Sequence, residues 1–186
     1  MANHVPYAEL HCRSNFSFLQ GASHPEQLVE QAQSLGLEAL ALTDRNGLYG
    51  IVRFAEAARV LGLPTVFGAE LQLDSGSLVI IARNPRGYAH LSSAISAGQL
   101  AGSKEHPVFV LEQLGEFSVG DWWVMTGGRD GAVVRALNEQ GPSAAERRVQ
   151  QMKTVFGNDS VLMEVWDHGD PLDSARNDVL VQIAHR

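Results

Sequence analysis

Six short apolar runs recur along the chain, and helical patterns separate most of them. This alternation constrains the fold more than any other feature, because apolar runs of roughly four to eight residues bounded by turns are typical of strands. The six runs lie at residues 7–11, 38–44, 64–71, 77–83, 121–127 and 160–166. Strands that alternate with helices favour an α/β fold with a largely parallel sheet.

Amphipathic patterns predict helices in the intervals. In the segment 23–36, Ser23 and Glu26 are spaced as a capping box, with Pro25 in the first turn. The helix at 48–62 has a predicted inward face of Leu48, Ile51, Val52, Ala55 and Ala58. Further helices are expected at 87–100, on both sides of Gly141-Pro142, and at 171–186. The inward face of the last is predicted to be Leu172, Ala175, Val179 and Ile183.

The charge of the chain limits its direct partners. The 186 residues suit one domain, and their formal net charge is −7, with 14 scattered Lys and Arg residues. Proteins that grip polyanionic DNA alone carry clustered basic residues, so a self-sufficient nucleic-acid binder is disfavoured. A domain attached to another part that binds DNA is compatible with this charge.

Localisation follows from what the sequence does not contain. A single cysteine provides no disulfide framework, which fits a reducing compartment. The first ten residues lack the pattern of a signal peptide, and no apolar stretch approaches the ~20 residues of a membrane span. We therefore expect a cytoplasmic domain without a membrane partner.

Polar residues collect at the carboxyl ends of the predicted strands, where α/β sheets and barrels build their sites. They are His11, Arg13, Asp44, Arg45, Glu70 and the pair Asp167-His168. Among them His11, Asp44, Glu70 and His168 could hold a zinc or manganese ion. The alternative is that all of them are ordinary polar caps tied up in hydrogen bonds. The residues alone leave both interpretations open, and they do not decide whether the sheet closes into a barrel.

Three other features have plain interpretations. The glycine-rich stretch 127–131 precedes a helix but lacks the spacing and lysine of a phosphate-binding loop, so a turn is favoured. Trp122 and Trp123 face opposite ways in a strand, which predicts one core and one surface tryptophan. Cys12 is interpreted as a small buried apolar residue.

Long stretches of the chain resemble one family. The run from Tyr7 to Leu71, with "LVIIARNPRGYAHLS" and "EVWDHGDPLDSARND", resembles the N-terminal PHP (polymerase and histidinol phosphatase) domain of bacterial C-family DNA polymerases. "TDRNGLYGIVRF" and "WDHGDPLDSARND" are similar to the error-prone, ImuC-type alpha subunits of that family.

The resemblance implies a distorted (β/α)7 barrel with six of its seven strands in this chain. Residues 1–6 would form an N-terminal tail and residues 7–186 a PHP domain that is incomplete at its C-terminus. The last strand, and the palm and fingers that carry the Mg²⁺-dependent polymerase chemistry, would lie beyond Arg186.

The resemblance also identifies candidate site residues. In active members a metal cluster is held by His, Asp and Glu at strand ends, and the opening His-x-His motif here reads His11-Cys12-Arg13. The positions that match the family's site, or lie near it, are His11, Arg13, Gln20, Asp44, Arg45, Glu70, Ser77 and His168. Arginines stay protonated and do not bind cations. We therefore expect a vestigial site without a catalytic residue or a bound metal, in which Arg13 and Arg45 pair with Glu70 and Asp44.

These features lead to three functional hypotheses. The first is a structural domain of an error-prone DNA polymerase. Its partners would be the rest of the polymerase chain, the accessory proteins of the mutagenesis cassette and the sliding clamp, and it would meet DNA only through the parent protein. The second is an active phosphoesterase or 3′→5′ exonuclease that uses zinc or manganese. The third, an α/β protein unrelated to replication, is disfavoured by the extent of the resemblance.

Overall fold

The computed structural model describes residues 5–186. The strands of its sheet are β1 (Ala8–Glu9), β2 (Ala39–Leu42), β3 (Thr65–Leu73), β4 (Gly76–Ala82), β5 (Trp122–Met125) and β6 (Val161–Leu162). The α-helices of this part of the chain are α1 (Pro25–Ser34), α2 (Ile51–Leu61), α3 (Pro85–Ala101), α4 (Leu111–Ser118), α5 (Ala132–Gln140), α6 (Pro142–Phe156) and α7 (Asp173–Ala184). A short 3-10 turn, Asn158–Ser160, precedes β6.

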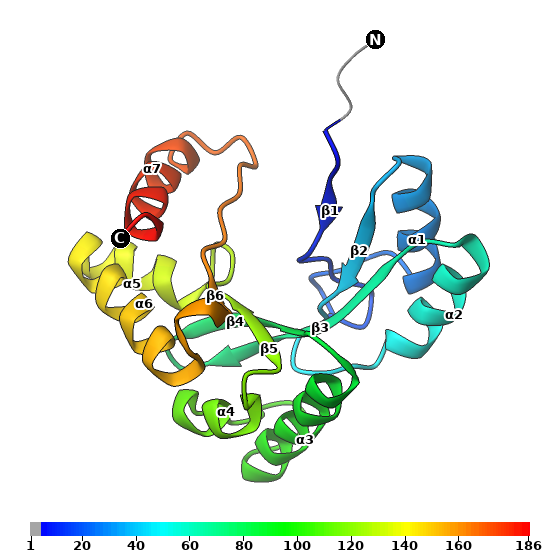
Figure 1. Ribbon diagram of the computed structural model, residues 1–186, viewed down its shortest axis with the longest axis horizontal. Helices are drawn as coiled ribbons and strands as arrows, with labels where there is room; N and C mark the ends of the chain where they lie inside the picture. Colours follow the sequence, from blue (N-terminus) through cyan, green and yellow to red (C-terminus); the bar gives the residue numbers. More distant parts are fainter. Residues whose placement is uncertain (1–4) are drawn as a thin grey trace.

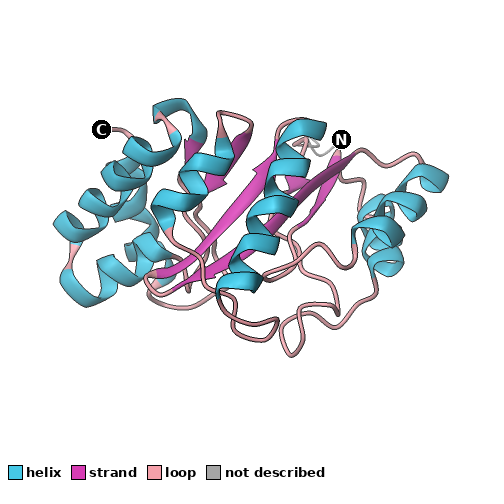
Figure 2. Cartoon of the chain, turned by 90° about the horizontal axis from the view of Figure 1, so that it is seen from below, coloured by secondary structure: helices cyan, strands magenta, loops and turns pink. Residues whose placement is uncertain are grey.

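The sheet is a curved half-barrel whose strands lie in sequence order from β1 to β6. Its two edge strands, β1 and β6, rise on opposite sides of an open face, and the helices cover the outer face (Figure 1). Figure 2 views that outer face from below and shows helices crossing in front of the strands. The predicted α/β class and incomplete barrel are therefore confirmed.

The sheet is more mixed than predicted. Strand β4 is antiparallel to both β3 and β5, whereas the pairs β1–β2, β2–β3 and β5–β6 are parallel. The tight turn at residues 74–75 makes β4 run back along β3, because a parallel return needs a crossover of about a dozen residues. Strand β5 then resumes the direction of β3 and is therefore antiparallel to β4. The start of β4 consequently lies beside the end of β3, with Ser77 opposite Gln72. Ser77 is thus placed at the same edge as the carboxyl ends of the other strands.

Two large apolar clusters and a small third one support this arrangement. The largest one joins β3, β4 and β5 to helices α3 to α7, and the second packs α1 and α2 against β2 around the fully buried Phe54. Trp122 lies in the largest cluster with no exposed surface, while Trp123 on the opposite face is 36% exposed. The prediction of one core and one surface tryptophan is confirmed.

Two helical details differ from the sequence predictions. The residue that caps α1 is His24, not Ser23, and its main-chain N–H donates to the Gln27 side chain at 2.9 Å. Pro25 lacks an N–H and occupies the first helical position, so the residue before it becomes the cap. In α2 the buried residues are Ile51, Phe54 and Ala58. Val52, predicted to face inward, is 66% exposed.

The end of the chain shows a similar shift. Helix α7 buries Leu180 and Ile183, whereas Leu172 and Ala175, both predicted to face the core, are exposed. Leu172 is the cap of this helix and lies before its first turn. Helix α4 has no counterpart among the predicted helices.

At the other end, residues 1–4 of the predicted tail lie outside the described residues, and Val5 and Pro6 have no regular structure. None of the helices within residues 5–186 is long and apolar enough to cross a membrane.

Candidate functional site

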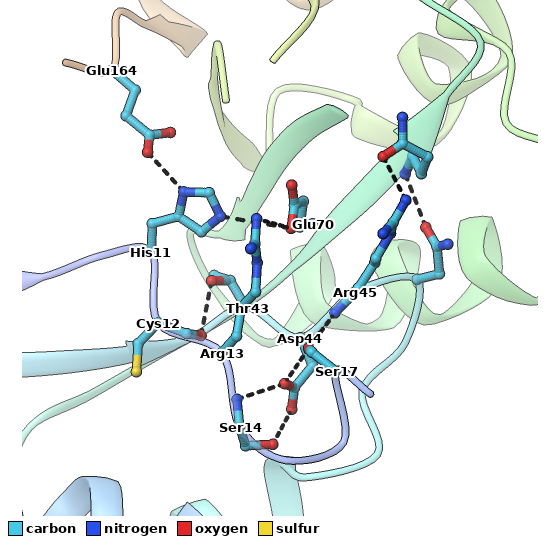
Figure 3. A network of polar contacts seen from close by, with 12 residues as sticks. His11, Cys12, Arg13, Ser14, Ser17, Thr43, Asp44, Arg45, Glu70 and Glu164 are labelled. Atoms are coloured by element: carbon cyan, nitrogen blue, oxygen red, sulfur yellow. Dashed lines mark hydrogen bonds and ion pairs between the residues drawn. The ribbon is translucent and has the colours of Figure 1, made fainter. Parts of the chain in front are cut away.

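The candidate site lies at the edge of the sheet where the strands end. A cleft of about 1080 Å³ opens there between the segment 7–13, around β1, and the segment 162–168, which begins at the last residue of β6. His11 and Arg13 enter it from one side and Glu164 enters from the other, while Glu70 on β3 lies on the far side of His11 from Glu164, next to Arg13 (Figure 3). The curvature of the sheet thus brings together residues more than 150 positions apart in the sequence.

Arg13 and Glu70 form an ion pair at the floor of the site. The Arg13 Nη2 atom lies 2.6 Å from Glu70 Oε2, and the Glu70 side chain is only 4% exposed. Burial alone would raise the pKa of Glu70, but contact with His11 and the charge of Arg13 outweigh it and lower this pKa to about 2. Glu70 is therefore a carboxylate at neutral pH. The predicted pairing of Arg13 with Glu70 is confirmed.

His11 lies between two carboxylates. Its Nδ1 atom is 2.7 Å from Glu164 Oε1, and its Nε2 atom is 3.8 Å from Glu70 Oε2. Burial alone would lower the pKa of His11, but the two glutamates outweigh it and raise this pKa to about 9. The imidazole is therefore protonated at neutral pH, and its Nδ1–H donates to Glu164. The result is a chain of alternating charges in the order Glu164, His11, Glu70 and Arg13.

Asp44 is held in a different way from the prediction. It is 1% exposed and accepts hydrogen bonds from the Ser14 main-chain N–H at 2.8 Å and the hydroxyls of Ser14 and Ser17, both at 2.7 Å. Arg45 instead donates to the Gln72 side chain at 2.8 Å. The predicted Arg45–Asp44 pair is therefore wrong, because consecutive residues of an extended segment point to opposite sides.

The other predicted site residues lie around this cluster. Ser77 is fully buried at the start of β4, where its main-chain N–H donates to the carbonyl of Asp130 at 3.0 Å. Gln20 and His168 are both exposed and line the cleft. The structure thus brings His11, Arg13 and Glu70 into direct contact and leaves the remaining predicted residues at the periphery.

Glu164 is the residue that the sequence predictions missed. It lies two residues after the end of β6, and its main-chain N–H donates to the Thr126 hydroxyl at 3.0 Å, which fixes its position. The sequence did contain a signal for Glu164, since it is the only charged residue in the apolar run 160–166. The prediction placed the polar residues of this strand end at Asp167 and His168 instead.

Two neighbours of the site follow the plain interpretations. The segment 127–131 forms a turn in which the Gly131 N–H donates to the Gly128 carbonyl at 2.9 Å. Cys12 is half-buried against the α1–α2 cluster, and burial raises the pKa of its thiol to about 11. At neutral pH it is therefore a thiol rather than a nucleophilic thiolate.

The donor set does not fit a metal centre. Within residues 5–186 no group of three or more His, Cys, Asp or Glu residues is arranged to hold a metal ion. Glu70 and Glu164 are engaged by the cations Arg13 and His11, and Asp44 is saturated by the hydroxyls and N–H of residues 14–17. The ion pairs connect the segments that follow β1 and β6 to each other and to β3.

Comparison with known proteins gives this geometry a context. The chain is similar to the error-prone DNA polymerase of Mycolicibacterium paratuberculosis, with 48% identity over 98% of this chain and 18% of that protein. The error-prone DNA polymerase of Cutibacterium acnes is 45% identical, again over 98% of this chain and 17% of that protein. The chain therefore spans less than a fifth of the length of these two relatives.

Solved structures support the same fold. A protein from Bifidobacterium adolescentis, described as a metal-dependent phosphoesterase, superposes with a TM-score of 0.65 and 19% identity over 98% of this chain and 84% of that one. An amidohydrolase from Chromobacterium violaceum superposes with a TM-score of 0.55 and 15% identity, covering 81% and 74% of the two chains. The family model of the PHP domain matches residues 9–168. The chain belongs to the PHP domain family.

Proposed function

We propose that this chain is the PHP domain of a longer error-prone DNA polymerase, in which it acts as a structural support and not as a metal-dependent enzyme. The observation that carries the proposal is the Arg13–Glu70 ion pair at 2.6 Å. A fixed guanidinium occupies the position beside the buried carboxylate that an active site would need for a metal ion. The identity of 45–48% to error-prone polymerases supports the parent function.

The proposal extends to the setting of the parent protein. DNA-directed DNA synthesis, with Mg²⁺, belongs to the part of the polymerase outside these residues, and its biological role is translesion synthesis and damage-induced mutagenesis in the cytoplasm. As part of an alpha-type subunit, the domain contacts the rest of the polymerase chain. Accessory proteins of the mutagenesis cassette, the sliding clamp and DNA are reached through the parent. The net charge of −7 supports this indirect role toward DNA.

The test uses the full-length polymerase that carries this sequence. Primer extension and 3′→5′ degradation of a labelled primer are measured for the wild type and for Glu70→Gln, with Mg²⁺, Mn²⁺ or Zn²⁺ added. We expect extension in both proteins, no degradation that depends on Glu70, and no bound zinc or manganese by elemental analysis. Primer degradation that is abolished by Glu70→Gln would refute the structural role.

A second candidate is a metal-dependent phosphoesterase. The observations that favour it are the cleft, which His11 and Glu164 line, and the likeness in fold to a protein described as a phosphoesterase; a metal ion would have to displace the ion pair of these two residues. For such an enzyme, Mn²⁺ would stimulate hydrolysis of p-nitrophenyl phosphate, and His11→Ala would abolish it. Equal rates for the wild type and His11→Ala would remove this candidate.

A further inference from the structure

The loop that follows β1 exposes two large apolar side chains at its tip. Phe18 is 83% exposed and its neighbour Leu19 is 89% exposed. Leu19 also has a positive φ of 61°, a left-handed conformation that bulky residues rarely adopt. Single exposed apolar residues are common, but an adjacent pair with an unfavourable backbone conformation needs an explanation.

The loop is held rigidly below this tip. The hydroxyl of Ser17 donates to the buried Asp44, and the Ser17 carbonyl accepts hydrogen bonds from the N–H groups of Gln20 and Gly21, both at 2.9 Å. A side chain at Gly21 would place its Cβ 2.0 Å from the Ser14 carbonyl oxygen, so the loop closes as tightly as glycine allows. Phe18 and Leu19 are thus presented on a preorganised support, which lowers the entropic cost of binding.

The fold itself gains little from these two residues. Neither belongs to the apolar clusters of the described chain. A left-handed backbone is unfavourable for a bulky residue, and glycine would adopt it without that cost. Large apolar side chains that seat in a partner's pocket are typical anchors of protein interfaces. The tip therefore has the features of a contact made outside these 186 residues.

We propose that Phe18 and Leu19 insert into an apolar pocket on the part of the polymerase chain that lies outside these 186 residues. The proposal rests on the proposed function. Two observations select this occupant. The chain covers only 17–18% of its relatives, so most of the parent polypeptide is available as a neighbour. The segment 14–21 contains no charged residue, which suits an apolar protein pocket and not the phosphates of DNA.

The test is thiol labelling of the full-length polymerase. Gln20→Cys places a reporter next to the tip and leaves both apolar residues intact, and Val60→Cys, on the 78% exposed position of α2, is the matched control. Maleimide modification of each peptide is followed by mass spectrometry. Because labelling tracks the population of the open form, we expect the Gln20→Cys site to react about tenfold more slowly than the control. Adding Phe18→Ser and Leu19→Gly should remove most of that difference.

Each outcome decides the proposal. Equal labelling at the two sites would refute it, and so would protection that persists after the tip is changed. Protection that depends on protein concentration would indicate a second copy as the occupant and would also refute it. Primer extension by the same wild-type protein is measured in parallel. Its absence would refute the proposed function, whereas extension with an unprotected tip would refute only the docking of the loop.

Discussion

Loss of the Arg13 guanidinium should destabilise the domain more than its position at the cleft suggests. Arg13→Met keeps the apolar stem and removes the charge that lies 2.6 Å from Glu70. Breaking a buried ion pair typically costs about 3–5 kcal/mol, because the remaining charge is left uncompensated. The Arg13 side chain is 28% exposed, so water screens part of this effect, and His11 remains 3.8 Å from Glu70. We therefore expect a loss of roughly 2–3 kcal/mol.

Urea and thermal denaturation of the 186-residue chain measure this loss. A fall of that size in the free energy of unfolding corresponds to roughly 4–12 °C in the melting temperature of a domain of this length. Arg45→Met is the matched control, since the guanidinium of Arg45 donates to the neutral side chain of Gln72. Glu70→Gln in the Arg13→Met background should restore part of the stability, because it removes the uncompensated charge. Equal effects of Arg13→Met and Arg45→Met would refute the ion-pair argument.

Two further predictions concern the pH dependence of stability and the serine cradle, which is the pair of hydroxyls of Ser14 and Ser17 that donate to Asp44. The pKa of Glu70 is lowered from 4.5 to about 2, so its contribution to stability is complete above 4.5 and is lost as the pH falls toward 2. The pKa of His11 is raised from 6.5 to about 9, so its contribution is complete below 6.5 and is lost as the pH rises through 9. The urea midpoint should therefore be highest between pH 4.5 and 6.5, and His11→Gln should flatten the alkaline decline; an unchanged decline would contradict this assignment. Ser17→Ala should cost about 1–3 kcal/mol in urea denaturation, because it removes a donor to the buried Asp44. The exposed Ser93→Ala should stay within about 0.5 kcal/mol, and an equal loss in both variants would argue against the cradle.

The strand pattern predicted the sheet well because each strand carries its own signal. Each of the six apolar runs overlaps an observed strand, whereas helix α4 was missed. Its sequence includes Gly115, which weakens a helical pattern. The structure explains this glycine, since a Cβ there would lie 2.5 Å from the Val155 side chain of α6. Gly115 thus allows α4 to pack closely against α6, but its low helix propensity weakens the local pattern from which α4 could have been predicted.

The contacts of the site could be predicted only where a buried charge required a partner of opposite charge. Arg13 and Glu70 were paired because a buried carboxylate needs a counter-charge, and the structure shows that pair. The same argument failed for Asp44, because this carboxylate accepts hydrogen bonds from the Ser14 N–H and from the hydroxyls of Ser14 and Ser17 instead of pairing with an arginine. The sequence of a loop does not indicate which carboxylate its serine hydroxyls will bind. The contact of Glu164 with His11 spans 153 positions and depends on the curvature of the sheet, which local patterns do not encode.

The charge balance of the cleft explains why arginine suits this site. Two carboxylates, Glu70 and Glu164, face each other across His11, and both lie largely out of water. Two positive charges are needed to offset them, and the protein supplies both, one from Arg13 and one from the protonated His11. A histidine at position 13 would carry its charge only while protonated, whereas arginine keeps it at every physiological pH. The permanent charge of Arg13 also helps to hold Glu70 ionised, and the ionised Glu70 in turn helps His11 to remain protonated toward Glu164. The connection between the two edge strands therefore depends on the arginine, although Arg13 itself touches only one of the two carboxylates.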